Sequence, residues 1–318
     1  MLDLDSLELR DRLTLSREIP TAGERAALFN RVRRGEMVRL RRGVYVLAAE
    51  WALLDLAAKN RWESQAAVAL VGRDLVISHH SAAALWRLPW FGELPTQTHT
   101  VDDFAKGGRS SSELFRHTVG IPKLTERIDG VCVTTLARTV VDLCRASTFQ
   151  QGVVIADAAL RRTTHPLPHF PRTSLTREHL ATELALVHLR QGTAKARRVI
   201  DFADGAADRP GESLSRVNMA LAGFSAPKLQ VPLRGASGKW WTVDFWWPQF
   251  NLIGEFDGNM KYTDAEFLRG RTPNEALIDE KRREDDLRAA GHGMSRWPWD
   301  TAISLPRLRR HLLAAGVR

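Results

Sequence analysis

Acidic residues alternate with aromatic and apolar ones along the stretch Trp240–Lys261, WWTVDFWWPQFNLIGEFDGNMK, where closely placed carboxylates could bind a divalent cation. The run 240–247 is rich in aromatic and β-branched residues, which are typical of strands. A turn-like break follows, and residues 252–257 resume the strand pattern. If four residues form the loop, Trp247 pairs with Leu252 in an antiparallel hairpin.

Counting back along this hairpin sets Asp244 opposite Glu255, and Asp257 shares their face because residues two apart along a strand point the same way. Like charges that face each other across strands repel, and buried carboxylates are costly unless they are paired or bound to metal. A hard cation such as Mg²⁺ is held by carboxylate oxygens, and Mn²⁺ can substitute for it. We therefore expect Asp244, Glu255 and Asp257 to be metal ligands.

The overall composition indicates a polyanionic partner. The 318-residue chain carries a formal net charge of +9, its pI is about 10.1, and arginine outnumbers lysine. Arginine suits phosphate because its planar guanidinium donates two hydrogen bonds at once. This balance favours DNA as the partner, although the sequence leaves RNA open. The length allows two or three domains.

The cysteines and the hydropathy pattern indicate where the protein works. Cys132 and Cys144 lie in apolar runs and form neither a disulfide framework nor a zinc motif, which fits a reducing cytosol. The N-terminus is charged from its third residue onward, unlike a signal peptide. No apolar run approaches the roughly 20 residues that span a bilayer. We expect a cytoplasmic protein with no membrane partner.

Residues 1–50 carry the element order of a winged-helix DNA-binding domain. Helices are predicted over 7–15 and about 24–34, and two short strands over 37–40 and 43–47. A basic helix can enter the major groove, and a basic hairpin tip can reach phosphates. We expect DNA contacts from six arginines of this segment: Arg31, Arg33, Arg34, Arg39, Arg41 and Arg42.

Residues 51–205 are predicted to form a central, mainly helical domain with short strands at 75–78 and 131–133. His79 and His80 are adjacent, so they cannot share one helical face as ligands four apart do. We interpret both as capping or packing residues. The helices predicted in this domain cover 51–71, 78–88, 135–144, 149–161 and 175–202.

A polar break at 204–211 indicates the main domain boundary, so 206–318 is predicted to be the C-terminal domain. A helix over 212–221 carries Glu212 in its first turn, and a highly charged helix is predicted over 276–290. Helix, strand, hairpin, helix and strand in this order indicate a mixed sheet with helices on its faces. The predicted fold class of the whole chain is therefore α+β and multidomain.

The arginines of the C-terminal domain are expected to serve two purposes. Arg282 and Arg296 are predicted to contact DNA phosphates and to position the strand. Arg283 and Arg288 lie among the acidic residues of the charged helix, which favours ion pairs within that helix.

The C-terminal motifs resemble those of a nuclease superfamily. Glu212, Asp244, the run 255–258 (EFDG) followed by Lys261, an E-K-x-R-E helix and a closing G-x-x-x-x-R resemble the very-short-patch-repair-like branch of the PD-(D/E)XK nucleases. The resemblance covers roughly 205–318. It implies a restriction-endonuclease-like mixed sheet and Mg²⁺-dependent cleavage of DNA.

The resemblance also implies a role for each residue of the site. Asp244 and Glu255, with Asp257, would hold Mg²⁺ near the scissile phosphate, where the metal lowers the pKa of a bound water. Glu212 would bind the metal through water or act as a base. Lys261 would donate to the charge that develops on the phosphate.

The sequence departs from the superfamily pattern in two places. Asp257 stands where the E-x-K lysine is usual, and Lys261 stands where related sequences often carry histidine. Either Lys261 or Lys281 could supply the catalytic positive charge. An inactive nuclease fold retained as a DNA-binding scaffold is the alternative that these departures leave open.

The first half of the chain resembles the abortive-infection antitoxin family (AbiEi-like). The motifs are R-x-R-R-G-V-Y at 39–45, S-H-x-S-A at 78–82 and R-T-V-V-D at 138–142, and the resemblance covers about 1–160. Members of this family are winged-helix DNA binders that repress their own operons. The resemblance implies a possible toxin partner encoded in the same operon.

Two functions of different classes follow from these patterns. The favoured one is a Mg²⁺-dependent DNA endonuclease to which an N-terminal winged helix delivers DNA. The alternative is an AbiEi-like antitoxin or transcriptional repressor whose nuclease-fold domain is catalytically inactive. A homodimer would suit a cut through both strands. A zinc or nucleotide enzyme is not indicated, because cysteine–histidine spacing and a glycine-rich phosphate loop are missing from the sequence.

Overall fold

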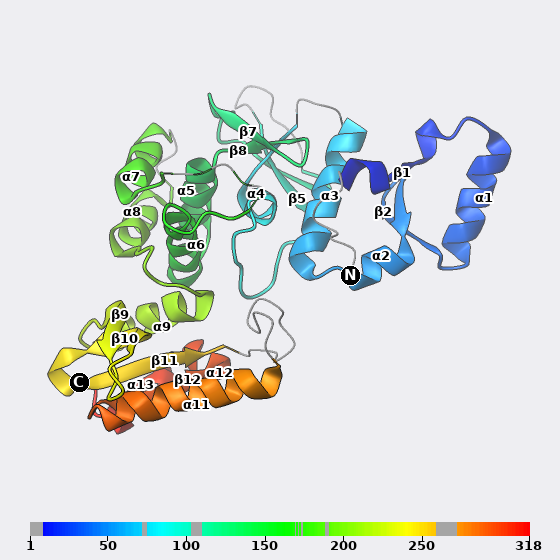
Figure 1. Cartoon of the computed structure of the whole chain (residues 1–318). Helices are drawn as coiled ribbons and strands as arrows, with labels where there is room; N and C mark the ends of the chain where they lie inside the picture. Colours follow the sequence, from blue (N-terminus) through cyan, green and yellow to red (C-terminus); the bar gives the residue numbers. More distant parts are fainter. Residues whose placement is uncertain are drawn as a thin grey trace. The chain divides into compact units, whose positions relative to one another are not determined.

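The computed structural model describes residues 9–71, 75–102, 110–168, 170, 172, 174–187, 191–258 and 272–318. It confirms an α+β, multidomain fold with several sheets. The chain forms two compact units, which can be followed by colour in Figure 1. The N-terminal unit comprises Met1–Thr148 and Leu175–Asp201, and the C-terminal unit comprises Phe149–Ser174 and Phe202–Arg318.

The N-terminal unit contains the helix predicted over about 24–34 and the hairpin predicted to follow it. Helix α1 (Ala22–Arg33) starts after Thr21, whose side chain forms a capping box with Glu24. Strands β2 (Met37–Arg41) and β3 (Val44–Leu47) pair antiparallel. The basic helix and the basic hairpin expected for DNA contact are therefore both present.

The helix predicted over 7–15 is wrong for the residues of that range that are described. Leu9–Arg12 forms a 3-10 helix (η1), and Thr14–Leu15 forms strand β1, which pairs antiparallel with β3. Ser16–Glu18 forms a second 3-10 helix (η2). The small sheet therefore has the order β1-β3-β2. Leu13, which lies inside the range predicted to be helical, is buried in a core that also includes residues of β3.

A five-stranded mixed sheet lies in the middle of the N-terminal unit, where the sequence predicted two strands. Helices still supply most of the regular structure in this part of the chain, as expected. The elements are α2 (Ala48–Leu53), α3 (Leu56–Val71), β4 (Val76–Ile77), α4 (His79–Leu85), β5 (Thr98–Val101), β6 (Leu114–His117), β7 (Thr125–Ile128), β8 (Val131–Thr134), α5 (Leu136–Ala146), α7 (Arg177–Leu186) and α8 (Thr193–Phe202). The strand order is β6-β5-β4-β8-β7, with parallel pairs β4–β8 and β5–β6. Strands this short give too brief a pattern for recognition from sequence.

His79 and His80 pack within a group of four histidines in the N-terminal unit, which confirms their interpretation as packing residues. The rings of His79 and His117 stack with 3.5 Å between centroids, and His117 Nε2 lies 3.0 Å from His99 Nδ1. The rings of His80 and His99 make a T-shaped contact with 5.0 Å between their centroids. Burial lowers the pKa of His80 to about 4 and that of His99 to about 3, so these rings pack in the neutral form.

The C-terminal unit is built around the predicted mixed sheet. Its elements are α6 (Phe149–Arg161), α9 (Pro210–Leu221), β9 (Lys228–Arg234), β10 (Trp240–Trp247), η4 (Pro248–Phe250), β11 (Leu252–Asp257), α11 (Pro273–Ala289), β12 (Gly293–Pro298), α12 (Trp299–Ala302) and α13 (Leu305–Ala314). The strand order is β12-β11-β10-β9, in which β11 and β12 are parallel and the other pairs are antiparallel.

Two hydrophobic cores fix helices against this sheet. The larger core joins β10, β11 and β12 to α9 and α13 through Met219, Phe245, Trp247, Phe256, Trp297, Leu308 and Leu312. A second core joins Val243 of β10 and Ile253 of β11 to Leu287 of α11. Helices α9 and α11 are thereby placed on either side of the strands that carry Asp244 and Glu255.

A buried ion pair ties α6 to the C-terminal unit, although the sequence placed this helix in the central domain. Asp157 of α6 is fully buried, and its carboxylate accepts hydrogen bonds from Arg216 Nη1 of α9 and from Asp204 N, both at 2.7 Å. Burial raises the pKa of Asp157 to about 6, against the effect of Arg216. The boundaries predicted from the sequence (1–50, 51–205 and 206–318) stay a prediction.

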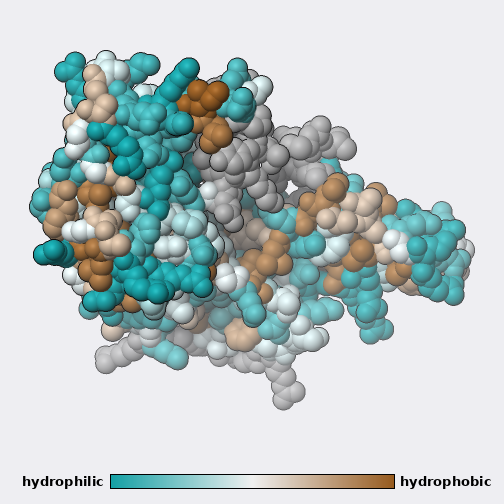
Figure 2. Space-filling model, turned by 90° about the horizontal axis from the view of Figure 1, so that it is seen from below, coloured by the Kyte–Doolittle hydropathy of each residue, from teal (hydrophilic) through white to brown (hydrophobic). Residues whose placement is uncertain are grey.

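The face shown in Figure 2 is mostly hydrophilic, and its hydrophobic residues form separate small patches. No helix among the residues that the structure describes is both long enough and apolar enough to cross a bilayer.

Gly254 of β11 is predicted to be required for the packing of the C-terminal sheet. A Cβ at this position would lie 2.7 Å from Trp297 Cη2 and 2.8 Å from Trp247 Cζ3, both in the buried core. We expect Gly254→Ala to destabilise the unit by about 1–3 kcal/mol, because overpacking a filled core forces side chains from their rotamers. Calorimetric thermal unfolding measures the change.

Gly23→Ala is the matched control. A Cβ at Gly23 in α1 would have nothing within 4 Å, and its backbone needs no left-handed conformation. This control is expected to be neutral or to stabilise by roughly 0.5–1 kcal/mol. Equal stability of the Gly254→Ala variant and the wild type would show that the core has free space.

Candidate carboxylate site

The hairpin that carries the predicted acids has the expected register. Trp247 pairs with Leu252, Trp246 with Ile253 and Phe245 with Gly254. The four-residue connection is the 3-10 turn η4 followed by Asn251, whose φ of 43° is left-handed. The register puts Asp244 and Glu255 in the next position along the two strands.

Asp244 lies where the hydrogen-bonded pairing of β10 and β11 stops, and its side chain takes over the contact between the strands. Its Oδ2 accepts a hydrogen bond of 2.9 Å from Phe256 N of β11. Its Oδ1 accepts one of 3.2 Å from Gln230 Nε2 of β9. Burial raises the pKa of Asp244 above its usual value, and the hydrogen bond from Phe256 opposes this shift.

Glu212 approaches Asp244 from helix α9. It stands in the first turn of the helix, as predicted, and is 2% exposed. Its Oε2 accepts hydrogen bonds from Asp208 N at 2.9 Å and from Gln230 Nε2 at 3.0 Å. Burial, followed by repulsion from Asp244, raises the pKa of Glu212 to about 8.

Gln230 is a site residue that the sequence analysis missed. Its Nε2 donates to both Glu212 and Asp244, so these carboxylates lie no further apart than the two hydrogen-bond lengths together. The backbone of Gln230 has a φ of 48°, a rare conformation for a residue other than glycine. Glutamine is common in strands, so its residue type alone could not predict Gln230 as a site residue.

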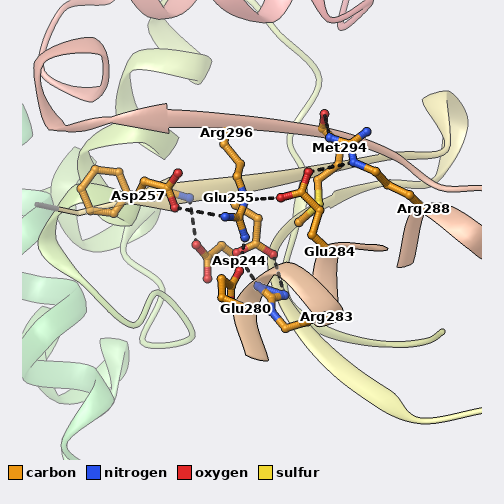
Figure 3. A network of polar contacts seen from close by, with 10 residues as sticks. Asp244, Glu255, Asp257, Glu280, Arg283, Glu284, Arg288, Met294 and Arg296 are labelled. Atoms are coloured by element: carbon orange, nitrogen blue, oxygen red, sulfur yellow. Dashed lines mark hydrogen bonds and ion pairs between the residues drawn. The ribbon is translucent and has the colours of Figure 1, made fainter. Parts of the chain in front are cut away.

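Glu255 is buried beside Asp244 and is bound by Arg283 of α11. Arg283 Nη1 donates to Oε1 at 3.1 Å, and Nη2 lies 2.8 Å from Oε2, so the pair is bidentate (Figure 3). Burial and repulsion from Asp244 raise the pKa of Glu255 to about 8, although Arg283 favours the charged form. Glu212, Asp244 and Glu255 thus interact electrostatically as one group.

Asp257 departs from its expected place in this group. Its side chain is 51% exposed at the end of β11, and its ion-pair partner is Arg296 of β12 at 3.8 Å. Burial raises its pKa, and Arg296 opposes the shift. Of the two candidate lysines, Lys261 lies outside the described residues, and Lys281 is exposed on α11.

The predicted division of the C-terminal arginines into phosphate contacts and ion-pair residues differs from the structure at Arg296. Arg282 is 76% exposed, as a phosphate contact requires. Arg296 is held by a short contact with Glu280 and by Glu284 at 3.5 Å, and its side chain is 24% exposed. Its surroundings are those of a structural ion-pair network, which Figure 3 shows, because the carboxylates of Asp257, Glu280 and Glu284 all lie near its guanidinium. The ion pairs expected of Arg283 and Arg288 are confirmed.

One of the six N-terminal arginines is not placed for DNA contact. Arg41 is 5% exposed, and its guanidinium donates to Thr98 Oγ1 at 2.5 Å and to the carbonyls of Glu113 and Glu63. The prediction for Arg41 is therefore corrected, because its donors are used inside the N-terminal unit. The other five stay predictions: Arg33, Arg34, Arg39 and Arg42 are exposed, and Arg31 is half-buried beside Glu36.

The carboxylates are not placed as a formed metal cage. Among the residues that the structure describes, no group of three histidine, cysteine, aspartate or glutamate side chains is arranged to hold a metal ion. Glu255 is turned to Arg283, and both oxygens of Asp244 accept hydrogen bonds. Among the described residues, the site is a buried acidic group in which Arg283 pairs with Glu255, and Arg209 and Arg296 act on it from further away.

Comparison with known proteins gives relatives over most of the chain. No family model matches the sequence. Two proteins of Mycobacterium tuberculosis, from strains CDC 1551 and H37Rv, are each 29% identical to it over 271 residues. The match covers 81% of this chain and 92% of each relative, and both relatives are described as uncharacterized.

Replacing Glu212 by glutamine is predicted to stabilise the protein at alkaline pH. The folded-state pKa of about 8 lies above the usual value of 4.5, so folding takes up a proton between these values. The stability contributed by protonated Glu212 is fully present below about pH 4.5 and is lost as the pH rises through about 8. Glutamine is uncharged, and its carbonyl can still accept from Asp208 N and Gln230.

We therefore expect the melting temperature of Glu212→Gln to exceed that of the wild type by a few degrees near pH 8. The difference should shrink toward about pH 5, where the wild-type carboxyl is protonated. Thermal unfolding across this range measures it. A variant that is less stable than the wild type near pH 8 would contradict the buried-acid description.

Proposed function

We propose that this protein is a Mg²⁺-dependent DNA endonuclease whose cleavage site lies in the C-terminal unit. The observation that carries the proposal is the meeting of Glu212, Asp244 and Glu255, which come from a helix and two neighbouring strands of one mixed sheet. The resemblance to PD-(D/E)XK nucleases in the same residues supports it.

The chemistry of the three carboxylates fits a divalent cation. Their oxygens are the hard donors that Mg²⁺ prefers, and Mn²⁺ accepts the same donors. If all three carboxylates were ionised, the guanidinium of Arg283 alone would not balance their negative charge in this buried place. Burial raises the pKa of Glu212 and of Glu255, so that protons relieve this excess, and a cation would relieve it as well. To bind both Asp244 and Glu255, the cation must compete with Arg283.

Each residue has a role in the proposed cleavage. Asp244 and Glu255 would hold the cation, and Gln230 orients Asp244 and Glu212 relative to each other. When bound, Mg²⁺ lowers the pKa of a coordinated water and neutralises charge on the phosphate. Glu212, whose pKa of about 8 is close to neutral pH, would accept the proton of the attacking water. The part assigned to Asp257 is smaller than predicted, because it is half-exposed and faces Arg296.

The N-terminal unit would supply DNA affinity in the cytoplasm. Arg33, Arg34, Arg39 and Arg42 are exposed on α1 and on the β2–β3 hairpin, and the whole chain is strongly basic. Arginines of this kind bind phosphates without reading sequence. Arg282 on α11 would contact phosphates near the cleavage site.

A second candidate function is an AbiEi-like antitoxin or repressor in which the C-terminal unit does not cut. Two observations favour it: Arg283 holds both oxygens of Glu255, and Asp257 occupies the position of the E-x-K lysine. A toxin encoded in the same operon would then be the partner. Both candidates bind DNA, so hydrolysis has to separate them.

Cleavage is tested by incubating supercoiled, linear and mismatched DNA with Mg²⁺ or Mn²⁺. We expect the wild type to cut at least one of these substrates, and Asp244→Ala and Glu255→Ala to lose about 100-fold or more of that rate. The control is Asp285→Ala, which removes an exposed carboxylate from α11 and should retain the rate. Equal cutting by the Asp244→Ala protein would mean a contaminating nuclease. If no substrate is cut and the protein binds its own promoter tightly, the repressor is the better account.

DNA binding by the hairpin is tested with two adjacent arginines. Arg42→Gln should weaken DNA binding and reduce the slope of log affinity against log salt by about one, because an exposed phosphate contact is lost. Arg41→Gln should leave that slope unchanged and lower the melting temperature, because Arg41 is buried with internal partners. A salt slope unaffected by Arg42→Gln would remove the hairpin from the DNA interface.

A further inference from the structure

Arg283 joins the proposed site to a ladder of alternating charges on α11 and β12. Its Nη1 and Nη2 face Glu255, and its Nε donates to Glu280 Oε2 at 3.2 Å. Glu280 in turn contacts Arg296, which lies 3.8 Å from Asp257 (Figure 3). The guanidinium therefore has two separate attachments, one through Nε and one through its two-nitrogen edge.

Only one of these two attachments would be lost if Glu255 turned away from Arg283. Glu280 would still hold Arg283 through Nε, so the side chain would stay beside the site. Its Nη1 and Nη2 would be left with hydrogen atoms to donate. Such a planar edge matches two oxygens of a phosphate group as well as it matches a carboxylate.

Arg283 and the proposed divalent cation would bind the same carboxylate, that of Glu255. Glu255 is 5% exposed, and removing Arg283 without a replacement would leave a buried negative charge beside Asp244. A divalent cation bound by Asp244 and Glu255 would replace that positive charge. Arg283 and the cation therefore compete for Glu255.

We propose that Arg283 is a positioning residue that holds Glu255 until the cation binds, and that its freed edge then binds a DNA phosphate. This inference rests on the proposed nuclease function. It makes cation binding and DNA binding mutually favourable, because the cation binds Glu255 and the DNA phosphate binds Arg283 once the pair has separated. It also gives Arg283 a contact with the substrate that ion pairing within α11 alone would not provide.

The test measures Mn²⁺ binding by electron paramagnetic resonance near pH 8 in the absence of DNA. We expect Arg283→Gln to bind Mn²⁺ about 10-fold or more tightly than the wild type, because the competitor for Glu255 is gone. Arg288→Gln is the matched control: Arg288 lies on the same helix and pairs with Glu284 at 2.8 Å, away from Glu255. Its Mn²⁺ affinity should equal that of the wild type.

A double-mutant cycle separates competition from simple charge repulsion. In the Glu255→Gln background, Arg283→Gln should no longer raise Mn²⁺ affinity, because there is no carboxylate to compete for. If Arg283→Gln raises the affinity by the same factor in both backgrounds, Arg283 only repels the cation, and the proposal is overturned.

A short DNA duplex tests the second half of the proposal. Its addition should raise the Mn²⁺ affinity of the wild type by about the factor gained in Arg283→Gln, and should change that of the variant little. An equal effect on both proteins would remove Arg283 from the phosphate contact.

The Mn²⁺-binding results distinguish a wrong role for Arg283 from a wrong nuclease proposal. If Mn²⁺ binding depends on Asp244 but Arg283→Gln leaves it unchanged or weaker, the metal site stands and the role of Arg283 is wrong. If the wild type, Arg283→Gln and Arg288→Gln all fail to bind Mn²⁺, both proposals are wrong.

Discussion

The C-terminal unit depends on one buried carboxylate, that of Asp244, which stands where the pairing of β10 and β11 stops. Its hydrogen bond from Phe256 N replaces the next backbone contact, and its hydrogen bond from Gln230 reaches the strand on the other side. A buried carboxylate without such donors would be costly. The position of Asp244 therefore fixes how three strands lie at the point where the acidic side chains meet.

The charges around Asp244 are balanced unevenly, and this imbalance links the structure to the proposed chemistry. Glu212 has hydrogen-bond donors but no described ion pair, whereas Glu255 has a bidentate arginine. Burial raises the pKa of both acids to about 8. A place that stabilises protons on carboxylates is also one where a divalent cation would find ligands, provided that it can displace the arginine.

Packing decides which side chains can take part. The core that includes Phe245 and Trp247 holds α9 against the sheet and so brings Glu212 toward Asp244. The core around Leu287 holds α11 and so brings Arg283 to Glu255. In the N-terminal unit, the packing of β2 turns Arg41 inward to Thr98 and leaves its neighbour Arg42 exposed. Neighbouring residues of the same type thus receive different roles.

The sequence by itself determined the features that local rules control. The length of the turn set the register of Trp247 with Leu252. The order of helix, strand, hairpin, helix and strand indicated a mixed sheet, and the capping box of Thr21 and Glu24 at the start of α1 is also a local feature of the sequence. Tertiary structure alone decided that Gln230 bridges two acids, that Arg283 reaches Glu255, that Asp257 faces Arg296 and that α6 joins the C-terminal unit. These contacts join residues far apart in the chain, and the packing that brings them together leaves no periodic mark in the sequence.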